Sequence, residues 1–399
     1  MTPLYLSFPL NKANPEVSIL MPCLNEAATI GKCVEKALQA LENLHLQGEV
    51  VVADNGSTDD SVSIAMDSGA RVVTIRERGY GAAILGGASA CRGQFILMAD
   101  ADDSYNLLEI KPFVDAWQQG AEIVMGNRFR GGIEANAMPF LHRYLGNPVL
   151  SFVGRLFFSS PFGDFHCGMR GFTRAAFDRM QLCSTGMEFA SEMVVKASLL
   201  NLVSAEVPVK LYRDGRNGPS HLNTWSDGWR HLRFLMLFSP RWVFFYPGLF
   251  FVFAGLMLST LLSKGVLPFQ SLQLDVSTLL YSNCLFLIGF QLVFFYLLSQ
   301  AFARRGGLLI SSGIGMGWFR LERGLMAAGL LMAAGFWFSF SALSYWKAQH
   351  FGTLNPQIVL RKVIPAASFF LLGFQLFSFS FYYSFLELGK SSAAGSSTN

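Results

Sequence analysis

Three carboxylates follow a hydrophobic segment in the first half of the chain. The apolar run QFILMA (residues 94–99) leads directly into Asp100, Asp102 and Asp103. Like charges this close repel one another, so a bound cation stabilises them. Carboxylate oxygens suit Mg²⁺ or Mn²⁺, and Mg²⁺ commonly bridges one or two carboxylates to substrate phosphates. We therefore expect Mg²⁺ or Mn²⁺ here; the alternative is that the aspartates only cap a helix beginning near Leu107.

The elements that position these carboxylates alternate between short apolar runs and helical patterns, from Val17 to about Gly126. Such βα repetition builds a mostly parallel sheet covered on both faces. Ligands bind beyond the carboxyl ends of its strands, where polar residues stand at 25–26, 54–59 and 100–103. No GxxxxGK[ST] follows a predicted strand, and the segment RGYGA is not GxGxxG, which excludes P-loop and dinucleotide-binding folds.

The second half of the chain is unusually apolar. Hydrophobic residues make up 52% of the sequence and charged residues 15%, and nearly all acidic residues precede Arg241. Four apolar stretches follow, near 242–263, 276–302, 324–346 and 363–388. Each is long enough to cross a hydrocarbon core about 30 Å thick, whereas buried core helices usually have only about 10 to 14 apolar residues. The sequence predicts four transmembrane helices.

Loop charges predict the orientation of these helices, because loops rich in Lys and Arg stay in the cytoplasm. Arginines precede the first span and occupy the loop between the second and third spans: Arg230, Arg233, Arg241, Arg304, Arg305, Arg320 and Arg323. Before the fourth span, Lys347, Arg361 and Lys362 argue the other way. We expect a multi-pass protein of the cell (inner) membrane, with its N-terminal domain in the cytoplasm.

Cysteine usage and net charge limit the compartment and the partners. Six cysteines without CxxC spacing, in a chain whose polar domain is expected in the cytoplasm, predict free thiols: Cys23, Cys33, Cys91, Cys167, Cys183 and Cys284. Residues 1–14 lack an apolar segment of signal-peptide length, so the first span is expected to direct targeting. The formal net charge of +4 is too small to indicate nucleic-acid binding.

Three motifs resemble family 2 (GT-A) glycosyltransferases: Pro22-Cys-Leu-Asn-Glu26, Asp54-Asn-Gly-Ser-Thr-Asp59 and Asp100-Ala-Asp102. More narrowly, residues 17–240 resemble the polyprenyl-phosphate hexose synthases, the group that contains dolichol-phosphate mannose synthase and bacterial undecaprenyl-phosphate glucosyltransferases. The resemblance implies a Rossmann-like α/β GT-A domain. It also implies inverting transfer of a hexose from a nucleotide diphosphate sugar to undecaprenyl or dolichyl phosphate. UDP-glucose or a similar UDP-hexose is favoured as donor, with GDP-mannose second.

The resemblance also implies roles for single residues. Asp102 matches the family's metal ligand, with Asp100 beside it, and Ser104 stands where many relatives have a metal-contacting Gln. Leu24 replaces a Tyr that is usual beside the nucleotide base. His221 replaces a Lys, which leaves the donor diphosphate to Arg213 or Arg216. The residues expected around the nucleotide sugar are Pro22, Leu24, Glu26, Asp54, Asp100, Ala101, Arg213 and Arg216.

Two further arginines match basic positions that hold the acceptor phosphate in the family. They are Arg128, in the segment GNRFRGG, and Arg143. Arginine grips phosphate oxygens with a planar fork, which lysine lacks. With Asp102 they form the expected catalytic set, although a solvated surface charge is the alternative for each. Asp164 and Arg170 match a segment expected to shape the site.

The predicted domain order is an extension (1–16), a GT-A catalytic domain (17–220), an amphipathic juxtamembrane helix (221–241), a membrane domain (242–390) and a disordered tail (391–399). The juxtamembrane segment is expected to place aromatic and aliphatic residues, including Trp225 and Trp229, on one side and Arg230 and Arg233 on the other, as in helices that lie in a membrane interface. A helix packed against the domain is the alternative.

The expected chemistry needs no general base, because a polyprenyl phosphate is already an anion near neutral pH. A metal on Asp102 would neutralise the departing diphosphate. The expected partners are therefore a nucleotide sugar, a polyprenyl phosphate and the bilayer, and homo-oligomerisation is left open. A processive polysaccharide synthase would show Gln-x-x-Arg-Trp, but Phe238 occupies the Gln position before Arg241. A non-enzymatic membrane scaffold that binds nucleotide sugar or lipid is the other alternative.

Overall fold

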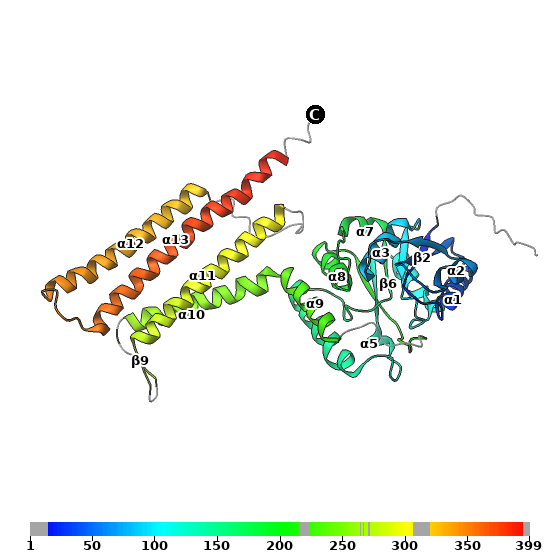
Figure 1. Ribbon diagram of the computed structural model, residues 1–399, viewed down its shortest axis with the longest axis horizontal. Coiled ribbons are helices and arrows are strands. Elements are labelled where there is room, and N and C mark those ends of the chain that lie inside the picture. The colour runs from blue at the N-terminus through cyan, green and yellow to red at the C-terminus, as the bar shows by residue number, and fades with distance from the viewer. Residues whose placement is uncertain are drawn as a thin grey trace, which may run out of the picture. The chain divides into compact units, whose positions relative to one another are not determined.

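The computed structural model describes residues 15–215, 224–263, 265, 267–269, 272–305 and 320–393 (Figure 1). These residues form two compact units, which divide between Phe238 and Ser239. The first unit thus contains the predicted catalytic domain and most of the predicted juxtamembrane segment. The second contains the apolar part of the chain.

The first unit is built on a seven-stranded sheet with strand order β3-β2-β1-β4-β6-β5-β7 among the described residues. Neighbouring strands are parallel except at β6, which is antiparallel to both β4 and β5. The prediction of a mostly parallel sheet is confirmed. The strands are β1 (Val17–Cys23), β2 (Gly48–Asp54), β3 (Arg71–Thr74), β4 (Phe95–Met98), β5 (Ile123–Asn127), β6 (Arg170–Thr173) and β7 (Ser204–Pro208).

Helices cover both faces of this sheet, as expected from its continuous apolar strands. α1 (Ile30–Asn43), α2 (Ser61–Asp67) and α4 (Lys111–Gln118) contribute to the core that contains Val17, Ile19 and Met21. α3 (Tyr80–Ala90), α7 (Arg174–Met180) and α8 (Phe189–Leu199) contribute to the core on the other face, around Leu20. Both faces of β1 are therefore buried.

One predicted helix is divided in two. The pattern over 107–119 predicted a single helix, but the chain forms a 3₁₀ turn at Leu107–Glu109 and then α4. Pro112 stands in the first turn of α4. In a continuous helix its ring would clash with the carbonyl four residues earlier, so the helix starts anew.

The segment before the first span forms α9 (Thr224–Leu237), which packs against the first unit. Phe234 and Leu235 are buried in a small core with Leu150 of α6 (Asn147–Phe158) and Val195 of α8. The alternative, a helix packed against the domain, is therefore correct for the face of α9 that carries Phe234 and Leu235. The exposed face carries the two tryptophans and also arginines, rather than separating them as predicted: Trp225, Trp229, Arg230, Arg233 and Leu237. Residues 221–223 lie outside the described part.

The second unit contains α10 (Tyr246–Ser263), α11 (Val276–Arg305), α12 (Leu321–Ala348) and α13 (Pro356–Ala393), besides a short hairpin of β8 (Leu267–Phe269) and β9 (Leu272–Leu274). Within the described residues, four helices are long and apolar enough to cross a membrane, as predicted: Arg241–Ser263, Val276–Arg304, Leu321–Ala348 and Pro356–Glu387. α13 extends to Ala393, into the predicted disordered tail, and residues 394–399 are not described.

Close backbone packing and polar contacts of arginines join the helices of the second unit. A Cβ atom on Gly255 of α10 would lie 2.5 Å from the amide nitrogen of Phe286 of α11. Small residues permit such approach of helices in membranes. Arg361 of α13 donates hydrogen bonds to the Leu262 carbonyl and to the Asp275 carboxylate. This side chain thereby connects the end of α10 and the start of α11 to α13.

Candidate active site

The loops that follow β1 and β2 interlock at the carboxyl edge of the sheet. The Asn25 amide donates to Ser57 Oγ at 2.9 Å, and Asn25 Oδ1 accepts from the Thr58 amide at 2.8 Å. The Glu26 amide donates to Ser61 Oγ at 2.7 Å. Asn25 is left-handed with φ 58°, a conformation that asparagine tolerates better than most residues. Side-chain to backbone bonds therefore fix the shape of both loops.

The residues predicted around the nucleotide lie on or beside these loops. Parallel pairing of β1 with β2 places Pro22 opposite Ala53 and Cys23 opposite Asp54. The buried Asp54 carboxylate accepts from the amides of Gly56 and Ser57, both at 3.1 Å. Glu26 is also buried and accepts from the Thr29 hydroxyl, whereas Leu24 is 40% exposed. Leu24 thus offers an apolar surface at this edge.

The sequence suggested that the three carboxylates after β4 form one group, but the structure separates Asp103 from the other two. Asp103 is left-handed, with φ 59°, and pairs with Lys32 at 2.5 Å and Lys36 at 2.6 Å, both on α1. Its counter-ions are therefore lysines. Asp100 and Asp102 remain as the pair at the sheet edge. Burial, together with the nearby charge of Asp102, raises the pKa of Asp100 to about 6.

Local hydrogen bonds orient this pair. Tyr80 donates its hydroxyl to Asp100 Oδ1 at 2.9 Å. Asp102 Oδ1 accepts from the Ser104 amide at 3.1 Å and from Ser104 Oγ at 2.5 Å. Ser104, predicted as a metal ligand, thus acts on the Asp102 carboxylate in this structure. The helix-cap alternative is wrong for both aspartates, because Asn106 caps the following turn.

The donor set at this edge fits a divalent cation. Among the described residues, no group of three or more His, Cys, Asp or Glu side chains could hold a metal. Mg²⁺ needs no such cage, since it usually keeps several waters and binds one or two carboxylates together with substrate phosphates. Asp100 and Asp102 would supply these carboxylates, with Ala101 between them.

Sequence analysis assigned no role to three residues around Asp100: Gly168, Tyr105 and Tyr80. A Cβ atom on Gly168 would lie 2.0 Å from Asp100 Oδ2, so a larger residue there would displace the Asp100 carboxylate. The hydroxyl of Tyr105 accepts from the Gly168 amide at 2.9 Å and holds it in place. Tyr80 also escaped notice, although it belongs to the RGYGA segment that was considered only as a failed dinucleotide motif. That segment forms the start of α3.

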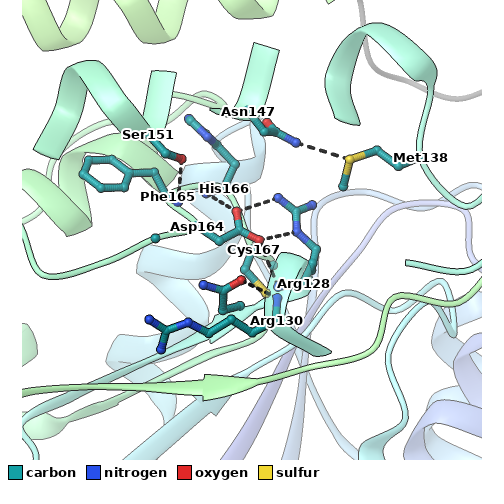
Figure 2. Close-up of polar contacts among 12 residues, drawn as sticks. Arg128, Arg130, Met138, Asn147, Ser151, Asp164, Phe165, His166 and Cys167 are labelled. Atoms are coloured by element: carbon teal, nitrogen blue, oxygen red, sulfur yellow. Dashed lines mark hydrogen bonds and ion pairs between the residues drawn. The ribbon is translucent and has the colours of Figure 1, made fainter. Parts of the chain in front are cut away.

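Arg128 is paired within the protein (Figure 2). Its Nε and Nη2 donate to the two carboxylate oxygens of Asp164 at 2.7 and 2.8 Å, and its amide donates to Oδ2 at 3.2 Å. Arg128 is 8% exposed and Asp164 fully buried. Arg128 was predicted to bind the acceptor phosphate with its guanidinium, and Asp164 was not predicted as its partner. Arg143, in the π-helical turn His142–Gly146, is half-buried, and its guanidinium lies 5.5 Å from the Tyr144 ring centroid.

The other predicted arginines differ in their surroundings. Arg170 is buried and donates to the carbonyls of Cys167, Ala190 and Phe165, which is a structural role. Arg213 is exposed. Its segment approaches the carboxylate pair, because the Gly215 amide donates to the Asp102 carbonyl at 2.9 Å. Arg216 and His221 lie outside the described residues.

Comparison with known proteins relates both units to one family. The family model "Glycosyl transferase family 2" matches residues 18–181, and "Glycosyltransferase family 2 C-terminal transmembrane region" matches residues 297–387. The chain is 35% identical over 373 residues to the low-salt glycan biosynthesis hexosyltransferase Agl6 of Haloferax volcanii, covering 90% of this chain and 89% of that protein.

Two other proteins are similar over the first unit. The dolichyl-phosphate hexose transferase of Haloferax volcanii is 28% identical over 214 residues, 53% of this chain and 89% of that protein. A crystal structure of glucosyl-3-phosphoglycerate synthase from Mycobacterium tuberculosis is 21% identical, with a TM-score of 0.46, over 56% of this chain and 80% of that one.

Proposed function

Because this chain belongs to glycosyltransferase family 2, we propose that it transfers a hexose from a nucleotide diphosphate sugar to a polyprenyl phosphate at the cytoplasmic face of the cell membrane. Its similarity to a named dolichyl-phosphate hexose transferase supports this acceptor class. A C-terminal transmembrane region supports the location, since a lipid acceptor is then within reach of the anchored enzyme.

The observation that carries the proposal is the pair Asp100 and Asp102 after β4. It stands at the edge where the loops after β1 and β2 interlock, and those loops carry Leu24, Glu26 and Asp54. Ligands of open α/β sheets bind at this edge. Nucleotide groups would occupy the loops, and the diphosphate would lie towards the carboxylate pair.

In the proposed reaction, a single nucleophilic displacement, each of these residues has a separate role. An anionic acceptor phosphate attacks the anomeric carbon opposite the leaving nucleoside diphosphate, which inverts the configuration. A divalent cation held by Asp100 and Asp102 would neutralise the leaving diphosphate. Arg143 would bind the acceptor phosphate through its guanidinium, and Arg213 would contact the donor diphosphate. Arg128, fixed by Asp164, would contribute its positive charge from a buried, preorganised position.

The favoured donor is UDP-glucose or a similar UDP-hexose, with GDP-mannose as runner-up. Leu24 gives the base an apolar neighbour but no aromatic ring to stack on. The favoured acceptor is undecaprenyl or dolichyl phosphate.

The test uses the purified full-length chain in lipid nanodiscs. UDP- and GDP-sugars are combined in turn with undecaprenyl and dolichyl phosphate, and both released nucleoside diphosphate and glycolipid are measured. We expect lipid-linked hexose from a UDP-sugar, with its anomeric configuration inverted relative to the donor. Turnover of GDP-sugars alone would overturn the donor assignment. Absence of glycolipid with every lipid phosphate would overturn the acceptor class.

A further inference from the structure

A loop of five residues, 164–168, contacts three separate parts of the first unit, and Figure 2 shows its Asp164 end at Arg128. At one end, the Asp164 carboxylate binds Arg128. At the other end, Gly168 lies against Asp100 and is held by the Tyr105 hydroxyl. In the middle, the side chain of His166 reaches α8. This loop therefore connects the helical layer to both charged parts of the candidate site.

The contact of His166 continues through α8 to α9. Ser191 Oγ lies 3.4 Å from His166 Nε2 and 2.9 Å from His231 Nδ1. Ser191 is fully buried on α8, and His231 is 8% exposed on α9. The two imidazole rings also touch edge to face, with centroids 4.5 Å apart. One hydroxyl thus connects two histidines from segments 65 positions apart, by subtraction of their residue numbers.

The single proton of Ser191 couples the two imidazoles. The hydroxyl can donate to one ring nitrogen and must accept from the other. If His231 carries its proton on Nδ1, Ser191 donates to His166 Nε2, and His166 carries its proton on Nδ1. If His231 Nδ1 carries no proton, Ser191 donates to it, and His166 Nε2 carries a proton that it donates to Ser191. His166 Nδ1 is buried and has no hydrogen-bond partner among the described residues, so nothing on that side fixes the ring.

The charges around His166 keep it neutral. Burial lowers its pKa well below the ordinary value, and His231, Arg128, Arg170 and His142 lower it further. The anion on its own loop, Asp164, is already bound to Arg128. A neutral imidazole has one ring nitrogen that can accept a hydrogen bond from Ser191, whereas both nitrogens of the charged form are donors.

We propose that His231 is a positioning residue for the acceptor side of the site. Through Ser191 and His166 it fixes the 164–166 end of the loop, and through Asp164 it fixes Arg128. The chain leaves α9 at Leu237 and enters the first span at Arg241, so the seating of the juxtamembrane helix bears on Arg128. The Gly168 end has its own support from Tyr105, so the donor side is spared. The inference rests on the proposed function for its assay.

The central test is Ser191→Ala in the full-length protein, with Ser198→Ala as its matched control. Both serines lie on α8, but the Ser198 hydroxyl donates to the Val194 carbonyl of its own helix and, within the described part of the chain, bonds no other element. We expect Ser191→Ala to raise the acceptor KM about three- to tenfold, the size of one lost hydrogen bond, with the donor KM within about twofold of wild type. Ser198→Ala should leave both constants unchanged.

Two variants of His231 separate positioning from packing. His231→Asn keeps a hydrogen-bonding atom near the place of Nδ1 and should retain most of the acceptor affinity. His231→Leu removes that atom and should resemble Ser191→Ala. Equal behaviour of Ser191→Ala and Ser198→Ala, or equal loss in His231→Asn and His231→Leu, would overturn the inference.

The same assays distinguish failure of the inference from failure of the proposed function. A wild-type protein that makes no lipid-linked sugar contradicts the proposed function. A wild-type protein that makes it, alongside a Ser191→Ala variant with an unchanged acceptor KM, contradicts the inference alone. A rise in donor KM equal to that in acceptor KM also contradicts it, because the effect would then be general.

Discussion

Two neighbouring carboxylates, Asp102 and Asp103, have opposite surroundings and give a matched pair for testing the metal. Asp103 is occupied by Lys32 and Lys36, whereas Asp102 faces the sheet edge beside Asp100. We expect Asp102→Ala to reduce transfer more than tenfold, a barrier change above about 1.4 kcal/mol, with the domain still folded. Asp103→Asn, which keeps a residue tolerant of positive φ, should retain most activity. Turnover of Asp102→Ala above a tenth of wild type would contradict the metal assignment.

Replacing Arg128 should destabilise the fold, whereas replacing Arg143, the other predicted acceptor arginine, should not. Arg128→Ala leaves the buried Asp164 carboxylate without its cation, which costs about 3–5 kcal/mol in comparable cases. Thermal unfolding of the solubilised protein should show this loss, and removing both charges in Arg128→Met/Asp164→Asn should restore much of it. Arg143→Ala should melt near wild type and instead raise the acceptor KM. If the two alanine variants melt alike, the Arg128 pair does not matter for folding.

His166 should make stability depend on pH. Its folded pKa is lowered, so below the ordinary value near 6.5 the unfolded chain binds a proton that the folded chain does not. Stability is therefore fully present above about pH 6.5 and declines as the pH falls towards the lowered pKa. His166→Asn should flatten this decline in a thermal-melt series across pH 5–8. The exposed His45 serves as control, and an equal flattening in His45→Asn would contradict the assignment.

Sequence analysis found the site residues whose partners are close in the chain. Asp100 and Asp102 follow one strand, and Asp54 is bound by the amides of the next few residues. It could not find pairings set by the tertiary fold. Asp103 meets Lys32 across 71 positions, and Asp164 meets Arg128 across 36. No local pattern distinguishes an arginine waiting for phosphate from one already bound.

At the scale of elements, the apolar runs predicted β1 to β5 and the four long helices, because burial on both faces and membrane length both leave continuous apolar sequence. β6 and β7 were not predicted. β6 has only four residues and begins with Arg170, whose buried guanidinium is satisfied by carbonyls from other elements. Its antiparallel pairing with β4 and β5 joins segments far apart in the chain, and no alternating pattern in its four residues indicates it.

The exposed tryptophans of α9 should lie in the membrane interface. Trp225 is 81% exposed and Trp229 57%, and aromatic rings of this kind favour the headgroup region. In proteoliposomes, brominated lipids should quench part of the tryptophan fluorescence, and Trp225→Ala/Trp229→Ala should remove a large share of the quenched emission. Trp117→Phe is the control, since Trp117 stacks on Phe95 inside the first unit. Equal quenching in wild type and double variant would contradict the interface placement.

At the scale of the whole molecule, two of the three charges that opposed the predicted orientation, Arg361 and Lys362, have partners within the second unit. Arg361 binds Asp275 and the Leu262 carbonyl, and Lys362 lies 5.1 Å from the Tyr345 ring centroid and bonds Ser341. Cations used in this way join helices to one another. These two cations therefore count less against the predicted orientation, which rests on the arginines before the first span and between the second and third spans.

Four spans should place both ends of the chain in the cytoplasm. Green fluorescent protein, which does not fluoresce when exported unfolded, should be bright when fused after Asn399. The same reporter fused after Ser263, behind the first span alone, should be dark, and alkaline phosphatase should show the reverse pattern. A dark fusion at Asn399 would mean that one of the helices Arg241–Ser263, Val276–Arg304, Leu321–Ala348 and Pro356–Glu387 does not cross.

The free cysteines make the first unit ready for site-specific labelling. Burial raises the pKa of the Cys23 thiol to about 11 and that of Cys33, Cys91 and Cys167 to about 12, so these groups stay protonated and inert towards maleimides. Cys183 is exposed and donates to Glu192 of α8; partial burial and this carboxylate raise the pKa of its thiol, so labelling needs a mildly alkaline pH. Once Cys284 of the second unit is replaced by serine, a single fluorophore on Cys183 would lie against α8, the helix whose Ser191 contacts both histidines. Its lifetime would then report, during turnover, whether the juxtamembrane helix stays seated.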